Sequence, residues 1–470
     1  MRRLALIPVL AVALVGVSPA QVWEKFLMPG LSYRMEIDPS GPRHIHVIRF
    51  APGVRGLSAK PEVSGGRIFA LPTDQGRETL TEMVSRTGAI GGINADFFPF
   101  TADPLGAMMR DGVLVSRPDP RRAVFAWGPG GATIAVLGWR GTVTKIGGST
   151  IGLNGMNEEC MENSIVLNTD GVAEAQAKNP SVHAVLKLEE EGPWGARVTR
   201  KAQVVEVRED LERLPVSKDT VVLTGRGTRA AEVRALQQGD NVSIQWDLTG
   251  IDTAQYDQIV GGGPFLIRNG KEFIDAEAQG FQKGFYQNRH PRTALGLTAR
   301  GEVVMVVVDG RQEMSVGASL QELADIMERL ECVQAINLDG GGSSTINLFG
   351  LTLNRPSDGS ERKVANSVLL FGPARQAPAT PEWTLEAPAE MTAGQATNLR
   401  ILDANKRPVP NAEILWGAQG NAWIDQGGRL RGLKEGEATV SAWVRGVLIR
   451  AKVSVKAAPG AATGAGAPRR

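Results

Sequence analysis

The run of residues best suited to chemistry is Asp339-Gly340-Gly341-Gly342-Ser343-Ser344-Thr345. Three successive glycines let the backbone turn sharply and present N–H groups toward an anion. A carboxylate and two serine hydroxyls flank that turn. The Lys-[Ser/Thr] pair of a nucleotide-binding P-loop is absent. The run therefore predicts either a tight structural turn or a cradle for an anion or sugar phosphate, and the pattern alone leaves both open.

A second acidic group stands among apolar residues in Asn94-Ala95-Asp96-Phe97-Phe98, where a strand predicted over 89–95 ends. Apolar neighbours raise the pKa of a carboxyl group because they disfavour its charged form. Asp96 is therefore a candidate acid or base. A turn-forming aspartate explains the same residue equally well.

Two further stretches carry weaker signals. Gly261-Gly262-Gly263-Pro264 follows an apolar pair, and a glycine run at a strand end is more often a turn than a ligand site. Arg289-His290-Pro291-Arg292-Thr293 precedes a predicted strand, and an arginine held beside a proline makes a fixed clamp for phosphate. A surface ion pair is the commoner fate of a single arginine.

The elements that must position these groups are clearest between residues 303 and 338. Val303 to Val308 is a continuous apolar run, typical of a strand covered on both faces. Ser319 and Glu322 form a capping box in front of an amphipathic helix. A second apolar strand, over 335–338, ends at Asp339. A shorter helix is predicted over 77–86, with Gly88 as its C-terminal cap.

This strand–helix–strand order predicts two neighbouring parallel strands joined by a crossover helix. The pair would bring Asp309 and Asp339 to the same edge of the sheet. Ligands bind at that edge in open α/β sheets. We therefore expect both carboxylates to face one site.

Few residues are available for a metal site. The chain has four histidines and two cysteines, too few for a multi-histidine site or a cysteine-ligated cluster. His44 and His46 alternate along one predicted strand without an evident third ligand, which favours a structural pair. The remaining metal hypothesis is a divalent cation held by Asp309 and Asp339. We expect no cofactor to be required.

Taken together and in this order, the motifs resemble those of the phosphodiester glycosidase family. The resemblance covers residues 26–373 and rests on several spaced motifs rather than on one. Beyond the stretches described above, the matching segments are Gly92 to Phe98, Val308 to Arg311, Asn354-Arg355-Pro356 and Asn366-Ser367. One position departs from the family pattern: Asn168 stands where an aromatic residue is expected before Thr169.

The resemblance implies an α+β fold with a mixed central sheet and packed helices. It implies Asp339 and Asp96 as catalytic carboxylates, with Asp309 as a third that supports them or holds a cation. It also implies a set of substrate- and phosphate-binding residues drawn from the same motifs: Asn94, Arg292, Thr293, Arg311, Gly340, Gly341, Gly342, Ser343, Ser344, Gly262, Gly263 and Arg355.

The implied activity is hydrolysis of sugar-1-phosphodiesters of the N-acetylglucosamine 1-phosphate type. A carboxylate stabilises or attacks the positive charge that develops at C1, while arginines and backbone N–H groups neutralise the phosphate leaving group. Two alternatives remain open. One is a glycan-binding or exopolysaccharide-assembly protein without turnover, and the other is a cation-dependent phosphodiesterase that breaks the P–O bond.

The chain of 470 residues is long enough for more than one domain. Residues 1–20 are typical of a secretory signal, with Arg2-Arg3, an apolar run and small residues before a cleavage site. We expect a catalytic domain over 21–375, a Pro-rich linker over 376–382 and a disordered tail over 457–470. Between the last two, residues 383–456 form a series of short strands that resembles a bacterial immunoglobulin-like β-sandwich.

Charge and hydropathy narrow the expected surroundings. Lys+Arg 52 and Asp+Glu 50 nearly balance, which does not favour a nucleic-acid partner. No later segment is long and apolar enough to predict a membrane span. We expect a secreted, periplasmic or cell-surface protein whose partner is a phosphate-linked glycan. Whether Cys160 and Cys332 pair is left undecided.

Overall fold

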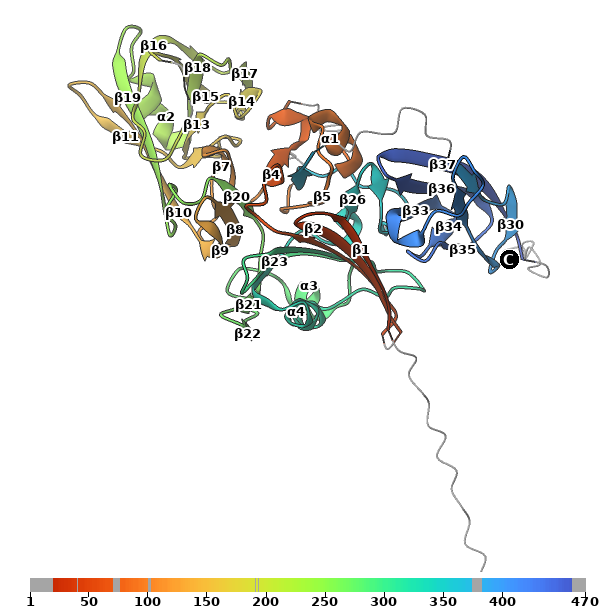
Figure 1. The fold of residues 1–470 in the computed structure, drawn as a ribbon. Helices are drawn as coiled ribbons and strands as arrows, with labels where there is room; N and C mark the ends of the chain where they lie inside the picture. Colours follow the sequence, from red (N-terminus) through yellow and green to blue (C-terminus); the bar gives the residue numbers. More distant parts are fainter. Residues whose placement is uncertain are drawn as a thin grey trace, which may run out of the picture.

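The computed structural model describes residues 20–39, 41–70, 77–99, 103–190, 192, 194–373 and 383–458. The predicted linker, nearly all of the signal segment and most of the tail lie outside these residues. The structure is mostly β, with 49% strand and 10% helix. The predicted α+β class with a mixed central sheet and packed helices is therefore wrong. The helices are real but short, and most strands are joined directly by turns (Figure 1).

An eight-stranded sheet forms the centre of the molecule, in the order β1-β2-β3-β24-β23-β25-β21-β22. Every neighbouring pair in it is antiparallel. Its strands are β1 (Gln21–Met28), β2 (Leu31–Asp38), β3 (Arg43–Phe50), β24 (Val303–Val308), β23 (Arg292–Thr298), β25 (Cys332–Asn337), β21 (Phe265–Arg268) and β22 (Lys271–Glu272).

This strand order also shows that the prediction of two neighbouring parallel strands was wrong. Strands β24 and β25 run in the same direction, but β23 lies between them and is antiparallel to both. A tight turn, in which Gly301 N donates to Thr298 O at 2.9 Å, folds β23 and β24 into a hairpin. Asp309 and Asp339 nevertheless leave the sheet at the same edge, as expected.

A five-stranded sheet, in the order β27-β26-β5-β28-β4, shares a hydrophobic core with the central sheet. Met305 of the central sheet and Ile93 and Val368 of the smaller sheet belong to that core. The strands are β27 (Leu351–Thr352), β26 (Ile346–Leu348), β5 (Gly91–Asn94), β28 (Asn366–Phe371) and β4 (Ser58–Val63).

Two amphipathic helices pack against the other faces of these sheets. Helix α4 (Leu320–Arg329) begins at the predicted capping box of Ser319 and Glu322 and packs on β24, which is buried on both faces as expected. Helix α1 (Leu80–Thr87) has the same kind of cap and packs against β28. A third helix, α3 (Lys283–Gln287), precedes β23. Among the described residues, none of the helices has the length and apolar character needed to cross a membrane.

Residues 107–261 build two further sheets, coloured from orange through yellow to green in Figure 1. A five-stranded sheet contains β7 (Val113–Ser116), β6 (Met108–Arg110), β20 (Gln258–Gly261), β8 (Ala123–Gly128) and β9 (Gly131–Val136), in that order. An eight-stranded sheet contains β11 (Thr150–Gly152), β10 (Gly138–Lys145), β19 (Asn241–Thr249), β16 (Arg200–Glu209), β15 (Ser181–Leu188), β18 (Thr220–Arg226), β13 (Ile165–Asn168) and β12 (Gly155–Met156). Helix α2 (Ala230–Arg234) and the pair β14 (Glu174–Gln176) and β17 (Arg213–Pro215) complete this region.

The C-terminal unit, residues 383–458, is built from short strands as predicted. Its three sheets contain β29 (Thr384–Glu386) with β32 (Arg400–Leu402), then β30 (Glu390–Thr392), β37 (Val447–Lys456), β36 (Gly436–Val444) and β33 (Ile414–Gly420), and finally β31 (Ala396–Asn398), β35 (Arg429–Gly432) and β34 (Ala422–Ile424). It has a hydrophobic core of its own. Its immunoglobulin-like class stays a prediction.

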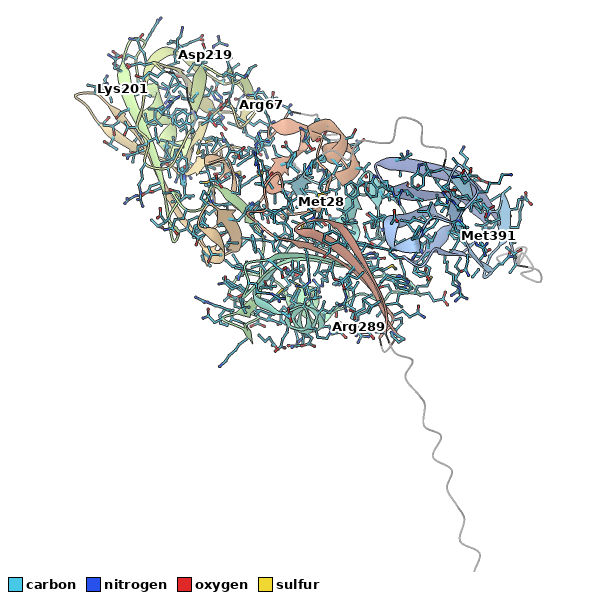
Figure 2. The ribbon with its side chains drawn as sticks, viewed as in Figure 1. Met28, Arg67, Lys201, Asp219, Arg289 and Met391 are labelled. Atoms are coloured by element: carbon cyan, nitrogen blue, oxygen red, sulfur yellow. The ribbon has the colours of Figure 1, made fainter. Side chains whose placement is uncertain are left out.

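This unit is firmly docked on the rest of the chain. The Trp443 ring stacks on Phe349 with centroids 4.0 Å apart, and Trp423 stacks on His44 at 4.9 Å. Trp443 belongs to the core that the two central sheets share. In Figure 2, Met28 of that shared core lies near the middle of the molecule, whereas Met391 lies within the C-terminal unit.

The two cysteines do not pair. Cys160 and Cys332 are buried free thiols. Burial raises the pKa of Cys332 to about 12, which leaves that thiol protonated and unreactive at neutral pH.

Candidate functional site

Asp339 and Asp96 come together where strands of two sheets end. Asp339 follows β25 and Asp96 follows β5. The two loops are fastened to each other because Asp339 N donates to Ala95 O at 2.9 Å and Asn94 Nδ2 donates to Asp339 O at 2.7 Å. The structure therefore joins the two carboxylates that the family resemblance assigned to catalysis.

Asp96 is buried with both of its carboxylate oxygens occupied. Oδ1 accepts a hydrogen bond from Phe97 N at 2.8 Å, and Oδ2 accepts one from Gly106 N at 2.7 Å. A Cβ atom on Gly261 would collide with Oδ2, so the first glycine of the Gly-Gly-Gly-Pro run is needed to admit this carboxylate. Burial raises the pKa of Asp96 to about 7, against the opposing effects of the Arg122 charge and the two N–H groups, and the negative charge of Asp339 adds to the rise.

Asp339, by contrast, is partly exposed. Burial of its carboxyl group raises the pKa to about 6, while the Ser343 hydroxyl, the Gly340 N–H and the charge of Arg362 oppose that rise. The loop behind it is held by Gly341 N, which donates to Pro291 O at 2.9 Å, and Gly341 has a φ of 64°. Asp339 is therefore the more exposed of the two residues, and Asp96 is fully buried.

Arg311 lies over the glycine turn, as the motif suggested. Its guanidinium Nη2 is 3.1 Å from the position that a Cβ atom on Gly341 would take. The side chain is exposed, and its contact with His290 Nδ1 is 3.4 Å long. Burial, together with the charges of Arg292 and Arg311, lowers the pKa of His290, so the imidazole is neutral at pH 7. Arg311 is thus free to bind an anion beside Asp339.

Two more arginines at the site were missed in the sequence. Arg122 lies 5.1 Å from the Phe97 ring centroid and 5.0 Å from that of Phe281, and its charge acts on Asp96. Its Nη1 atom is buried without a hydrogen-bond partner among the described residues. Nothing in the local sequence distinguishes Arg122 from its neighbour Arg121.

The second missed arginine, Arg362, lies against Gly342, the third glycine of the turn. Arg362 pairs with Asp358 at 2.7 Å, and a side chain on Gly342 would collide with both. Its charge lowers the pKa of Asp339. Arg122 therefore places positive charge near Asp96, Arg362 places it near Asp339, and Arg311 lies over the glycine turn that follows Asp339.

Arg292, predicted to clamp phosphate, is instead turned inward. It is buried and donates to Ala318 O at 2.8 Å, Phe285 O at 2.6 Å and Asn288 O at 3.0 Å. Burial and the nearby Arg311 charge lower its pKa to about 10. In this structure Arg292 fixes the backbone of α3 and the segment after it.

Asn94 and its neighbours form a buried polar network beneath the site. Asn94 Oδ1 accepts hydrogen bonds from Thr293 Oγ1 at 2.8 Å and Thr345 N at 3.0 Å. Thr293 Oγ1 also lies 3.2 Å from Ser344 Oγ. These residues hold the Asp339 loop against β5, which is a positioning role.

The remaining predicted glycines serve close backbone approaches. Gly263 N donates to Asn337 O at 2.7 Å, and Asn337 Nδ2 returns a hydrogen bond to Gly263 O at 2.9 Å. A Cβ atom on Gly262 would lie 2.8 Å from Asn337 O, and one on Gly340 would lie 2.7 Å from Pro291 O. The Gly-Gly-Gly-Pro run and the Asp339 loop are therefore packed directly against the neighbouring backbone.

Asp309 lies at the same edge of the sheet, but it is buried and both of its carboxylate oxygens accept hydrogen bonds from within the protein. Its carboxylate accepts from Asn354 Nδ2 at 3.0 Å and from Arg355 N at 3.1 Å, and His46 Nε2 is 3.6 Å from Oδ2. This arrangement fixes the loop that begins at Arg355. Within the described ranges, no cluster of three or more His, Cys, Asp or Glu side chains has the arrangement of a metal site.

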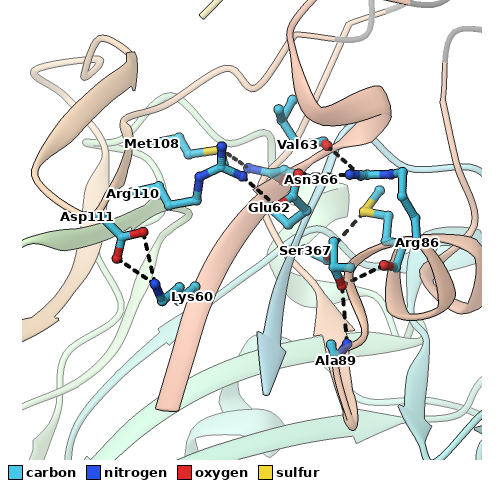
Figure 3. Close-up of polar contacts among 12 residues, drawn as sticks. Lys60, Glu62, Val63, Arg86, Ala89, Met108, Arg110, Asp111, Asn366 and Ser367 are labelled. Carbon is cyan, nitrogen blue, oxygen red and sulfur yellow. Dashed lines mark hydrogen bonds and ion pairs between the residues drawn. The ribbon is translucent and has the colours of Figure 1, made fainter. Parts of the chain in front are cut away.

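The Asn366-Ser367 motif anchors Asp96 from the other side. Asp96 N donates to Asn366 Oδ1 at 2.9 Å. Figure 3 shows Asn366 beside Met108, with Nδ2 3.9 Å from the sulfur, and Ser367 one residue further along β28. In the same view, Glu62 of β4 bridges Arg86 and Arg110. These contacts fasten β28 and β4 to α1 and β6.

Asn168, the departure from the family pattern, lies in the outlying eight-stranded sheet. It is completely buried on β13 opposite Val222, and its side-chain amide finds no hydrogen-bond partner among the described residues. Nothing in the structure explains why this buried position is polar, and no role in substrate binding is assigned to Asn168.

Comparison with known proteins relates this part of the chain to a family of glycosidases. Residues 195–371 match the family model described as phosphodiester glycosidase. The N-acetylglucosamine-1-phosphodiester alpha-N-acetylglucosaminidase of Bos taurus is 36% identical over 137 residues, which are 26% of this chain and 26% of that protein. The resemblance inferred from the motifs is thus confirmed over residues 195–371, the part of the chain that matches the phosphodiester glycosidase model.

Solved structures show the same fold. A hypothetical protein from Synechocystis superposes with a TM-score of 0.65 at 23% identity, covering 76% of this chain and 64% of that one. A protein of Burkholderia pseudomallei K96243, inferred to be exported, gives a TM-score of 0.59 at 24% identity, covering 70% of this chain and 74% of that one. The chain spans about a quarter of the length of the curated relatives it matches.

Proposed function

We propose that the protein is an exported hydrolase that cleaves sugar-1-phosphodiester linkages in envelope or extracellular glycans. The observation that carries this proposal is the partly exposed Asp339 close to buried Asp96, with the charge of Arg362 acting on Asp339, that of Arg122 acting on Asp96, and Arg311 lying over the glycine turn after Asp339. A carboxylate with adjacent cations suits a bond whose cleavage creates positive charge on the sugar and releases a phosphate. Export rests on the signal-like residues 1–20.

In this mechanism Asp339 acts at the anomeric carbon. Its carboxylate stabilises or attacks C1 as the C1–O bond breaks, and the electron pair of that bond leaves with the phosphate oxygen. Arg311 and Arg362 neutralise the departing phosphomonoester, so no strong proton donor is required. Water then adds to C1, displaces Asp339 where a covalent bond has formed, and passes one proton to the released phosphomonoester, which gives the free sugar.

Asp96 has a different part because it is buried and both its oxygens are bonded to N–H groups. Between about pH 6 and pH 7 the Asp96 carboxyl is mostly protonated and Asp339 is mostly ionised, so the site holds one negative charge, on Asp339. Ionisation of Asp96 adds a second negative charge, which opposes binding of an anionic substrate. We assign Asp96 to setting the charge of the site and Asp339 to the chemistry.

The test is hydrolysis of the methyl diester of N-acetylglucosamine 1-phosphate by the purified protein in oxygen-18 water. Label in the released sugar establishes cleavage of the C1–O bond and supports the proposal. Label in the phosphate means cleavage of the P–O bond and contradicts it. Absence of turnover over a panel of phosphate-linked sugars also contradicts it, and favours a glycan-binding protein.

A further inference from the structure

A pocket of about 490 Å3 lies between the loop 355–361 and the C-terminal unit. Thr79 and Thr81 from the start of α1 line one side, and Thr352 and Glu361 line the base. Gln419, near the end of β33, closes the pocket from the C-terminal unit. Arg355, one of the residues predicted to bind substrate or phosphate, also lines it, whereas Asp339 and Asp96 do not.

The polar groups of the pocket form one connected network. Glu361 accepts hydrogen bonds from Thr81 Oγ1 at 2.6 Å and Thr81 N at 3.0 Å, and the Thr352 hydroxyl also donates to it. Gln419 Nε2 in turn donates to Thr352 Oγ1 at 3.1 Å. Hydroxyl, amide and carboxylate groups held in this way are the partners that the hydroxyl groups of a neutral sugar require.

The pocket and the Asp339 site lie on opposite sides of a single loop. Arg362 and Asp358 of that loop reach the glycine turn at Gly342, whereas Ser360 and Glu361 line the pocket. Arg355, whose backbone N bonds to Asp309, contributes to the pocket lining as well. A substrate whose phosphate lies beside Arg362 therefore needs to cross only this loop to enter the pocket.

We propose that this pocket is a binding subsite for a neutral carbohydrate chain, the part of a phosphate-linked glycan that lies beyond the phosphate. The proposal rests on the proposed function, since it extends the substrate away from Asp339. It gives the C-terminal unit a direct part in substrate recognition through Gln419 and Ala418. A diester that carries only a methyl group beyond the phosphate does not reach these residues.

Two variants test the subsite. Ala418→Trp fills the pocket, and Gln419→Ala removes its amide; Asn398→Ala, an exposed amide on β31, is the matched control. Kinetics are measured on two substrates: the methyl diester of N-acetylglucosamine 1-phosphate, and the same sugar phosphate esterified to a neutral tetrasaccharide. Thermal unfolding of each variant is measured alongside.

We expect both pocket variants to raise KM for the tetrasaccharide diester, by about tenfold for Gln419→Ala and more for Ala418→Trp, with the methyl diester unaffected. Asn398→Ala should behave as the wild type. Equal losses on both substrates, or no loss on either, overturn the subsite.

A wild-type protein that hydrolyses neither diester overturns the proposed function instead. The subsite is then judged by calorimetry with the tetrasaccharide free of phosphate. Binding that Ala418→Trp abolishes and Asn398→Ala preserves supports the subsite in that case. Absence of binding to the wild type, or equal binding to Ala418→Trp, overturns it.

Discussion

Asp96 should destabilise the folded protein at alkaline pH, and Asp96→Asn should recover part of that loss. Burial raises the pKa of Asp96 from 3.8 to about 7, which corresponds to about 4 kcal/mol between the ionised and neutral forms. Asparagine removes the charge, but it leaves the N–H of either Phe97 or Gly106 facing an amide, at a cost of about 1–3 kcal/mol. We therefore expect the free energy of unfolding at pH 8 to rise by about 1–3 kcal/mol.

The sign of this effect depends on pH. Asp96 binds its proton more tightly in the folded than in the unfolded protein, so its contribution to stability is fully favourable below about pH 4. That contribution is lost as the pH rises through about 7, where the folded carboxyl ionises. At pH 4 the folded carboxyl is neutral and the unfolded one is only about half ionised, so little of that stability has been lost, and Asp96→Asn should then be no more stable than the wild type.

Urea unfolding followed by the fluorescence of the nine tryptophans measures both conditions. Asp219→Asn serves as the control, because Asp219 is exposed on the outlying sheet (Figure 2) and should give no pH-dependent difference. If Asp96→Asn is destabilised equally at pH 8 and pH 4, burial of an ionised Asp96 is not what limits stability, and the reasoning is refuted.

The remaining predictions concern activity. Asp339→Asn should lower turnover by about 10²–10⁴-fold without changing thermal unfolding, whereas Asp96→Asn should stay active. A near-wild-type rate for Asp339→Asn, or loss of activity in both variants, would contradict the division of roles between the two carboxylates. A pH profile of kcat/KM should rise through about 6 as Asp339 ionises and fall through about 7 as Asp96 ionises, and Asp96→Asn should lose the fall. A falling limb retained in that variant would assign it to another group. Arg311→Ala should raise KM for the methyl diester by about tenfold to a hundredfold, as measured by steady-state kinetics. An unchanged KM would show that Arg311 does not bind the phosphate. Chelation with EDTA should leave the rate unchanged because the Asp309 carboxylate is already bonded to Asn354 and Arg355; a loss that added divalent cation restores would revive the metal hypothesis.

Local patterns in the sequence predicted individual elements well and their neighbours poorly. The apolar run of β24 and the capping box at Ser319 and Glu322 are both present as predicted. The insertion of β23 between β24 and β25 was missed, since a strand's apolar pattern specifies burial and carries no information on which strand it pairs with. The α+β class, which was taken from the family resemblance, was wrong because the structure is 49% strand and only 10% helix.

The same limit applies to the site: its residues could be identified from motifs, but the directions of their side chains could not. Asp339, Asp96 and Arg311 were identified from motifs and lie together. The direction of each side chain was not predictable: Arg292 points into the protein, whereas Arg122 reaches Asp96 from a segment without a motif. Side-chain direction is decided by tertiary packing, and a single sequence records only residue type and spacing.

The docking of the C-terminal unit has a consequence for how the chain is made. Lys25 in the first strand donates to Asn411 O, a contact between residues 386 positions apart, and Trp443 completes the core in which Leu27 and Met28 are buried. Strand β1 can pair with β2 as soon as both have been made, but the ribosome must synthesise almost the whole chain before β1 meets the C-terminal unit. Contacts of such long range slow folding. The nascent protein consequently keeps apolar surface uncovered through most of its synthesis. We therefore expect a chaperone that binds unfolded chains to reduce the amount of misfolded protein more than faster elongation would.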